Sequence, residues 1–324
     1  MEISLNLIIT KLIQKRASDM YLLPTAHDYR LLANIGGHLC LLQMVENSQA
    51  VRWIANLKYQ ANMAVSEHRR PQAGALQWAE GEHVDVRLST VGDFQGRESL
   101  VARFIYKLSR EGFGLLVPDQ WRQLKEAVNQ RGMVLFAGPT GSGKTTTMYR
   151  LATMFRSGVV MTIEDPVEIR EPTFLQLQVN RLAGMDYQDL LRVGLRHRPQ
   201  VFIIGEIRDS ETTQMAIQAA LSGHLVLAIV HARSASGVIA RLRQLGADSY
   251  YLDQTLTGVC YQRLIPDQAD KLAVLFDLLL GKDLHDTIIN KKSGGMSDEW
   301  RHHLAQAVTE EKIESAMATK FNNG

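Results

Sequence analysis

Apolar and polar residues follow two different patterns along the chain, and the pattern changes near residue 108. Before that point, short runs in which apolar and polar residues alternate, as at 83–88 and 100–105, stand among helix-like stretches. Alternation with a period of two is typical of a strand with one buried face. Residues 5–13 instead space their apolar side chains like one buried face of a helix. Residues 1–108 are therefore predicted to form a small α+β domain.

The second pattern begins after a segment that breaks the first. Two glycines interrupt residues 109–114, so we place a linker at 109–117, and Pro118 is predicted to open a helix. Beyond it, apolar strand-like runs alternate with helical ones, at 133–137, 159–163, 201–204 and 225–230. This alternation is typical of a parallel sheet with crossover helices. Residues 118–324 are predicted to form one α/β domain that ends in a helical appendage from about 283.

The composition narrows the class of protein. A length of 324 residues fits about two domains, and 45% hydrophobic with 22% charged residues is typical of a soluble globular protein. The net charge of +2 offers no electrostatic basis for direct nucleic-acid binding. Cys40 and Cys260 lie far apart and belong to no CxxC pair, so we expect two reduced, buried thiols and neither zinc nor a disulfide framework.

The most specific motif is GPTGSGKTTT at 138–147. It lies between a strand-like run and a helix-compatible run, the context that a phosphate-binding loop requires. Its glycines let backbone N–H groups surround phosphate oxygens, while Lys144 is expected to contact the β- and γ-phosphates and Thr145 to hold Mg²⁺. The predicted nucleotide-binding residues are Gly138, Pro139, Thr140, Gly141, Ser142, Gly143, Lys144, Thr145 and Thr146.

Carboxylates follow two of the predicted strands. Glu164 and Asp165 directly follow the run 159–163, and Pro166 comes next and stops the strand. One of them is suited to orienting an attacking water, although taken alone this pair is more often an ordinary polar strand end. Glu206 follows the buried run 201–204, an arrangement that brings a carboxylate to Mg²⁺ directly or through water.

Histidines and arginines supply weaker signals. His224 and His231 flank the strand 225–230, and by themselves histidines at a strand end are more often structural. Arg87, Arg97 and Arg103 lie in the first domain. Motor ATPases take a stabilising arginine from a neighbouring subunit, but surface arginines on a strand need an independent reason for that role.

Taken in order, the motifs resemble those of the secretion and pilus-assembly ATPases of type II and type IV secretion systems. The similarity extends over nearly the whole chain. It rests on ASDMY at 17–21, RPQAG at 70–74, TIEDPVE at 162–168, GEIRD at 205–209 and SGHLVL at 222–227 with His231. Several ordered motifs are far more specific than a phosphate-binding loop alone.

The resemblance implies a RecA-like P-loop NTPase motor domain, preceded by a small PAS-like N-terminal domain. It also implies roles for individual residues: Glu164 polarises the attacking water with support from Asp165, and Glu206 lies at Mg²⁺. His224 and His231 would sense the γ-phosphate, and the first domain would offer Arg87 and Arg103, with Arg97 less certain, to a nucleotide.

Departures from the family's motifs indicate which type of secretion ATPase this sequence resembles. The chain lacks the tetracysteine insertion after the histidine box, so no zinc is expected. RHRPQ at 196–200 and HAR at 231–233, with the compact length, look most similar to the competence pilus assembly ATPases of Gram-positive bacteria. The AIRNL signature of retraction motors is absent, which favours assembly.

The resemblance therefore implies a cytoplasmic homohexamer, peripherally associated with the cytoplasmic face of the membrane. It would hydrolyse ATP to ADP and phosphate with Mg²⁺ and act on an inner-membrane platform protein to assemble a competence type IV pilus for DNA uptake. A type II secretion motor or another type IV pilus motor is the alternative within the family.

Two other classes stay open. A DNA-translocating NTPase is disfavoured by the near-neutral charge, and a nucleotide switch without useful turnover is disfavoured by Glu164. A guanine-specific protein would carry NKxD, but residues 290–293 read NKKS and lack the aspartate. ATP is therefore the expected nucleotide.

Overall fold

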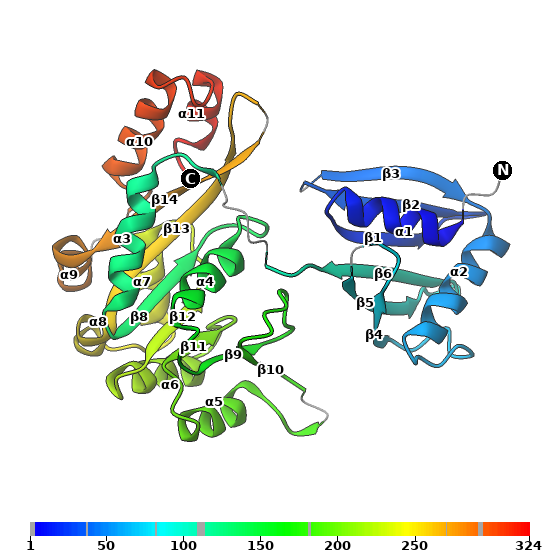
Figure 1. The fold of residues 1–324 in the computed structure, drawn as a ribbon, viewed down its shortest axis with the longest axis horizontal. Helices are drawn as coiled ribbons and strands as arrows, with labels where there is room; N and C mark the ends of the chain where they lie inside the picture. The colour runs from blue at the N-terminus through cyan, green and yellow to red at the C-terminus, as the bar shows by residue number, and fades with distance from the viewer. Residues whose placement is uncertain are drawn as a thin grey trace. The chain divides into compact units, whose positions relative to one another are not determined.

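The computed structural model describes residues 4–36, 38–81, 83–108, 114–180, 183–269, 271–290 and 294–324. The chain divides into two compact units, Met1–Lys107 and Leu108–Gly324, drawn in Figure 1. Residues 109–113 of the linker expected at 109–117 lie outside the described residues. Each unit is described by itself.

In its described residues, the first unit is a six-stranded antiparallel sheet with two helices. The strand order is β3-β2-β1-β6-β5-β4. The apolar side chains of the N-terminal helix that the spacing assigned to one face are buried, which confirms that helix. The elements are α1 (Leu5–Gln14), β1 (Ala17–Pro24), β2 (Tyr29–Ile35), β3 (His38–Val45), α2 (Asn47–Gln60), β4 (Gln72–Trp78), β5 (Val84–Gly92) and β6 (Glu98–Ile105).

The edge strand β3 corrects one expectation. Cys40 lies on this strand and is exposed, whereas Cys260 is buried. The prediction of two buried thiols is therefore wrong for Cys40. The reason is its place in the sheet, since β3 is the outermost strand and pairs with β2 alone.

The second unit contains an eight-stranded sheet in the order β10-β9-β11-β12-β8-β13-β14-β7. The pairs from β10 through β8 to β13 are parallel, and β14 pairs antiparallel with β13. The four strands expected from the sequence are confirmed to within one residue at each end. The strands are β7 (Gly114–Leu115), β8 (Gly132–Ala137), β9 (Val160–Glu164), β10 (Leu175–Gln178), β11 (Val201–Ile204), β12 (Leu225–Ile229), β13 (Leu256–Pro266) and β14 (Leu272–Leu280).

Helices cover both faces of this sheet, as Figure 1 shows. On the central strand β8, Val134 and Phe136 pack with α3 and α4, whereas Met133 and Leu135 pack with helices of the other face. A strand buried on both faces is the hallmark of a parallel α/β sheet. The helices, with one 3₁₀ turn that follows α4, are α3 (Pro118–Asn129), α4 (Lys144–Ala152), η1 (Thr153–Phe155), α5 (Tyr187–Arg196), α6 (Ser210–Leu221), α7 (Ala235–Gln244), α8 (Ser249–Thr255), α9 (Gly281–Ile289), α10 (Asp298–Thr309) and α11 (Ser315–Phe321).

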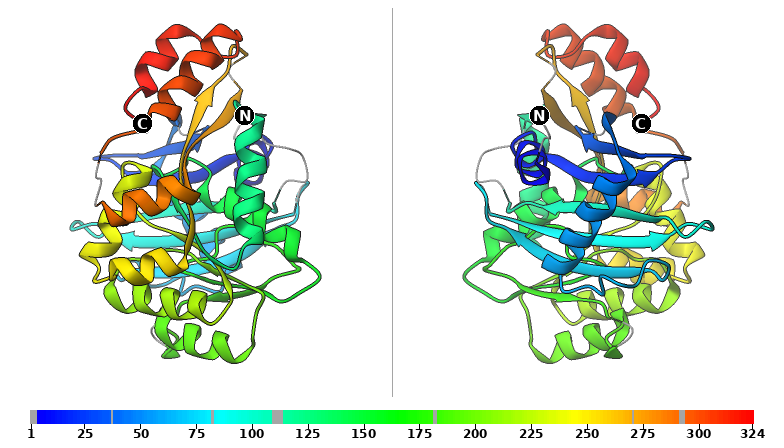
Figure 2. Two further views of the ribbon diagram at one scale, coloured as in Figure 1. Left: turned by 90° about the vertical axis from the view of Figure 1, so that its left-hand side faces the viewer. Right: turned by 90° about the vertical axis from the view of Figure 1, so that its right-hand side faces the viewer.

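The helical appendage packs against the β13–β14 hairpin. Figure 2 shows α10 and α11 beside this hairpin, with α10 in contact with β14 and α11 in contact with β13. Trp300 of α10 is fully buried, and its Nε1 donates a hydrogen bond of 2.9 Å to the Phe321 carbonyl. Across the described parts of the chain, none of the helices has the length and apolar character needed to cross a bilayer.

Trp300→Ala is expected to lower the free energy of unfolding of the second unit by about 3–5 kcal/mol, because it leaves a cavity the size of an indole. Denaturant titration followed by circular dichroism measures this loss. The matched control is Tyr250→Ala on α8, since Tyr250 is 66% exposed and its removal is expected to change stability by less than about 0.5 kcal/mol. Equal stability of the two variants would contradict the packing role of Trp300.

Candidate functional site

The loop 138–143 joins the central strand β8 to the helix α4. Gly138, Gly141 and Gly143 all have positive φ angles. At Gly138 a Cβ atom would lie 2.4 Å from the Gln262 carbonyl oxygen, so only glycine fits there. Gly143 is the N-cap of α4 and no side chain caps this helix. Its first N–H groups are therefore open to an anion, and the helix dipole favours one.

The lysine and threonine that follow the loop are held by hydrogen bonds. Lys144 Nζ donates to the carbonyl oxygens of Gly138 at 3.0 Å and Pro139 at 2.8 Å. Burial lowers the pKa of Lys144, and the carboxylates of Glu168 and Glu206 act in the opposite direction. Thr145 Oγ1 donates to Glu168 Oε2 at 2.9 Å.

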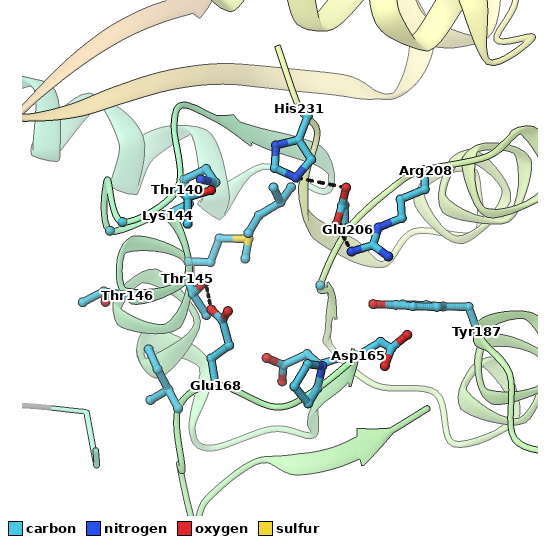
Figure 3. A pocket seen from close by; sticks show the side chains of 18 residues that line it. Thr140, Lys144, Thr145, Thr146, Asp165, Glu168, Tyr187, Glu206, Arg208 and His231 are labelled. Carbon is cyan, nitrogen blue, oxygen red and sulfur yellow. Dashed lines mark hydrogen bonds and ion pairs between the residues drawn. The ribbon is translucent and has the colours of Figure 1, made fainter. Parts of the chain in front are cut away.

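A cavity of about 450 Å³ opens where the loop meets the carboxyl ends of the strands (Figure 3). Open α/β sheets place their ligand sites at this edge. Gly138, Pro139 and Ser142 are absent from its lining. The predicted residues that line it are Thr140, Gly141, Gly143, Lys144, Thr145, Thr146, Glu164, Asp165, Glu206 and His231.

Glu164 ends strand β9 and is only 3% exposed. Its Oε1 accepts hydrogen bonds from the Tyr149 hydroxyl at 2.5 Å and from Thr162 Oγ1 at 2.7 Å. Burial raises the pKa of Glu164, and the two hydroxyl hydrogen bonds work against that rise. The carboxyl group is thus fixed in position and is more basic than an exposed glutamate.

Glu206 lies between a guanidinium and an imidazole. Its Oε2 accepts from Arg208 Nε at 2.6 Å, and its Oε1 lies 3.0 Å from His231 Nε2. Figure 3 shows both partners turned toward it. The hydrogen bond from Arg208 to Glu206 raises the pKa of Arg208, so the guanidinium stays charged.

Gly205 allows the strand ends that carry Glu164 and Glu206 to approach each other. A Cβ atom at Gly205 would lie 3.0 Å from the Tyr187 hydroxyl and 3.2 Å from Glu164 Cα. A side chain at this position would require the Tyr187 hydroxyl and the end of β9 to shift by a few tenths of an ångström. The glycine that precedes Glu206 therefore shapes the acidic side of the cavity.

His224 is not brought to this cavity. It precedes strand β12 and His231 follows it, so the five residues of the strand, roughly 16 Å of extended chain, separate the two histidines. His224 Nδ1 instead lies 2.7 Å from the Pro199 carbonyl oxygen, and its ring packs edge-on against Phe202. The expectation that both histidines share one site is wrong. One histidine lies at the amino end of β12 and the other beyond its carboxyl end, so they are at opposite ends of this strand.

Arg87 and Arg103 lie in the first unit, opposite each other on β5 and β6. Arg103 Nε donates to Asp19 Oδ1 at 2.9 Å. Arg97 is engaged elsewhere in this unit, where its Nε donates to Asp93 Oδ2 at 2.9 Å. None of the three is part of the cavity lining.

The sequence motifs did not assign a role to several residues of the site. Glu168 and Arg208 lie inside the motif segments 162–168 and 205–209, so a signal for them was present. Tyr149 follows Thr145 by one helical turn, a position from which it could have been suspected. Tyr187 and Gln262 carry no local signal, because they reach the site from distant elements.

Oxygen atoms in the cavity lining are suitable ligands for a small divalent cation. The hydroxyl of Thr145 and the carboxylates of Glu168 and Glu206 all line the cavity. Oxygen ligands of this kind are those that Mg²⁺ prefers, usually together with phosphate oxygens and water. The residues present therefore fit Mg²⁺ bound with a nucleotide.

Known proteins match this chain over most of its length. The family model described as "Type II/IV secretion system protein" matches residues 1–316. Competence protein ComGA of Streptococcus pneumoniae is 42% identical over 80% of this chain and 82% of its own length. Competence protein ComGA of Bacillus subtilis is 34% identical over 90% and 88%. The putative type II secretion system protein E of Escherichia coli is 36% identical over 81% of this chain but 54% of its own length.

Solved structures share the fold. The ATPase DotB of Legionella pneumophila superposes with a TM-score of 0.74 at 20% identity, over 98% of this chain and 94% of that chain. The pilus retraction motor PilT with bound ADP superposes with a TM-score of 0.71 at 24% identity, over 98% and 97%. The fold is therefore that of the RecA-like secretion ATPases, as the sequence motifs implied.

Proposed function

The chain belongs to the type II/IV secretion system protein family and is an ATPase, and from this premise we propose that it powers assembly of a competence type IV pilus for DNA uptake. The observation that carries the ATPase chemistry is one cavity that joins the loop lysine Lys144, the buried base Glu164 and the clamped carboxylate Glu206. The competence role is supported by 42% and 34% identity to competence relatives over more than four fifths of their lengths.

In the proposed reaction, the N–H groups at the start of α4 and the Lys144 ammonium hold the β- and γ-phosphates of ATP. A water oxygen attacks the γ-phosphorus, the bond to the β–γ bridging oxygen breaks, and Glu164 accepts the proton of the water with Asp165 in support. Thr145, Glu168 and Glu206 would hold Mg²⁺, directly or through water. When bound, this ion neutralises charge on the phosphates.

His231 is proposed to report the state of the γ-phosphate. Its Nε2 lies 3.0 Å from Glu206 Oε1, so a change at the phosphate or at Glu206 alters its hydrogen bond. Nothing comparable supports His224, which lies outside the cavity lining.

We infer that the protein works as a homohexamer at the cytoplasmic face of the membrane, where it acts on a platform protein. In this assembly Arg87 and Arg103, which are cross-strand neighbours, would be offered to a neighbouring subunit's nucleotide. Because arginines of a neighbouring subunit would complete each site, ATP hydrolysis would require the assembled hexamer.

The alternative within the family is a type II secretion motor. The type II relative from Escherichia coli is only 54% covered by the match, whereas the two competence relatives are 82% and 88% covered. The identity is also higher to the Streptococcus pneumoniae competence relative, 42% against 36%, which favours the competence role. The near-neutral charge also disfavours a DNA-translocating NTPase.

Gene deletion separates these roles. We expect a deletion strain to lose natural transformation while it secretes proteins normally, and the wild-type gene, but not a Lys144→Ala copy, to restore DNA uptake. Loss of secretion with intact transformation would instead assign the protein to secretion.

Tyr149→Phe is expected to move the acid limb of kcat for ATP hydrolysis to higher pH. The Tyr149 hydroxyl lowers the pKa of Glu164 against the rise caused by burial, so its removal keeps the carboxyl protonated up to a higher pH. Because the base acts only when ionised, the variant loses most activity at the acid end of a profile from about pH 5 to about pH 9. Tyr250→Phe on α8 is the control, and coincident profiles for all three proteins would exclude Glu164 as the titrating base.

A further inference from the structure

Gln262 is a buried polar side chain that reaches the phosphate-binding loop from a distant part of the sequence. It lies on β13, which pairs with the central strand β8, and it is 0% exposed. Glutamine is rarely buried in this way unless it is hydrogen-bonded. The Gln262 Nε2 atom donates to the Ser142 carbonyl at 2.6 Å, so the side chain is bound to the loop 138–143.

The loop also approaches this residue closely. A Cβ atom at Gly138 would lie 2.4 Å from the Gln262 carbonyl oxygen, and one at Gly143 would lie 3.4 Å from Gln262 Nε2. Both ends of the loop therefore lie against one residue of β13. Gln262 is absent from the lining of the cavity drawn in Figure 3, so it acts on the loop from outside the cavity.

One hydrogen bond carries the polar part of this contact. The Ser142 hydroxyl and Gln262 Oε1 are both buried and make no hydrogen bond with the residues that the structure describes. If the Nε2 donor is removed, the Ser142 carbonyl loses its Gln262 partner, and a buried polar group that loses its partner destabilises the arrangement around it. The loop is then expected to leave its present position.

Movement of the loop would also move the lysine that follows it. Lys144 Nζ donates to the carbonyl oxygens of Gly138 and Pro139, so the position of the ammonium depends on these two residues. A loop that is already held in its binding form does not have to be ordered when the ligand arrives, and its affinity is higher for that reason.

We propose that Gln262 is a positioning residue for ATP: its amide holds the loop 138–143 and Lys144 in the arrangement that binds the triphosphate. The assignment rests on the proposed function and adds to it a residue that sets nucleotide affinity from outside the cavity lining. Because the loop binds phosphates, the effect falls on the triphosphate and not on the base.

The chain offers a matched control in Gln120 of α3. This glutamine is also buried, and its Nε2 donates to the Phe276 carbonyl at 2.6 Å, while its Oε1 accepts from the Phe276 N–H at 3.1 Å. The two glutamines therefore make the same kind of hydrogen bond to a backbone carbonyl. Gln120 is bonded to β14, whereas Gln262 is bonded to the loop.

Equilibrium binding of ATP and of inorganic tripolyphosphate to full-length Gln262→Met and Gln120→Met tests the assignment. Methionine keeps the length of the side chain and removes the N–H donor. We expect Gln262→Met to weaken both ligands about tenfold, the scale of one buried hydrogen bond, and to raise the KM for ATP to the same extent. Its kcat at saturating ATP should stay within about threefold of the wild type. Gln120→Met should lose stability in denaturant titration but bind both ligands like the wild type.

The possible failures are distinguishable. If the wild-type protein binds neither ATP nor tripolyphosphate, the proposed ATPase function fails. If the wild type binds both ligands and Gln262→Met binds them equally well, the positioning role is overturned and the ATPase function stands. The same conclusion follows if Gln120→Met loses as much affinity, or if Gln262→Met loses affinity for ATP alone.

A second variant decides the question if Gln262→Met fails to fold. Gln262→Asn keeps a buried amide but is one methylene shorter, so its N–H groups are withdrawn from the Ser142 carbonyl. We expect the same loss of affinity for ATP and tripolyphosphate as in Gln262→Met. Wild-type affinity of Gln262→Asn for both ligands would overturn the positioning role.

Discussion

Lys144→Ala is expected to abolish ATP hydrolysis, with a loss of about a thousandfold in kcat/KM and a marked loss of ATP affinity. Among the residues that the structure describes, Lys144 Nζ donates to the carbonyl oxygens of Gly138 and Pro139, whereas the Arg208 guanidinium is already engaged with Glu206. Lys144 is therefore the cation that the loop can offer to phosphate oxygens. Phosphate release and calorimetric ATP titration measure the two losses.

The control for Lys144→Ala is Lys282→Ala, which removes an exposed ammonium from α9 outside the cavity lining. This variant should hydrolyse ATP like the wild type. A Lys144→Ala protein that folds and keeps wild-type turnover would refute the proposed mechanism.

Glu164→Gln is expected to lower kcat by about 10²–10⁴-fold while ATP affinity stays within about threefold. Glutamine keeps the oxygen that accepts from Tyr149 and Thr162 but cannot take a proton from water. Single-turnover phosphate release and ATP titration separate chemistry from binding. Glu168→Gln, which alters a carboxylate of the same cavity, is the matched comparison and should lose less in kcat.

Stability provides a check on the Glu164→Gln result. Burial raises the pKa of Glu164, so the folded state favours the protonated carboxyl, and that contribution to stability is lost as pH rises through the folded pKa. Near neutral pH the charged carboxylate therefore costs stability, and the variant should melt at the same temperature as the wild type or higher. A lower Tm combined with lost activity would indicate misfolding instead of a missing base.

The pattern of apolar residues along the sequence was sufficient to predict the buried parallel strands of the second unit. The runs at 133–137 and 201–204 became β8 and β11, because a buried parallel strand is a continuous apolar run. The hairpin of β13 and β14 was not assigned as strands. Its long run 272–280 is apolar at nearly every position and has no alternation, so a period of two does not mark it as a strand.

The candidate site was predictable where strand ends supply its residues. Glu164, Glu206 and His231 follow parallel strands and meet at one edge of the sheet, and the same rule, applied to strand direction, would have excluded His224. Gln262 could not have been found this way, because its hydrogen bond of 2.6 Å to the Ser142 carbonyl spans 120 residues of sequence. The exposure of Cys40 likewise depends on the order of strands in the sheet, and the local sequence does not reveal that order.

The charge balance of the main cavity has a consequence for the form in which the nucleotide binds. Its lining carries four carboxyl groups, Glu164, Asp165, Glu168 and Glu206, against the two basic side chains Lys144 and Arg208. Even with Glu164 protonated, acidic groups outnumber these cations, so the side of the cavity that carries the carboxylates repels the negative charges of a bare triphosphate. A chelated triphosphate brings its own positive charge to the side where the carboxylates lie. We therefore expect chelated ATP to bind more tightly than free ATP, and chelator titration should weaken nucleotide binding far more steeply than ordinary salt does.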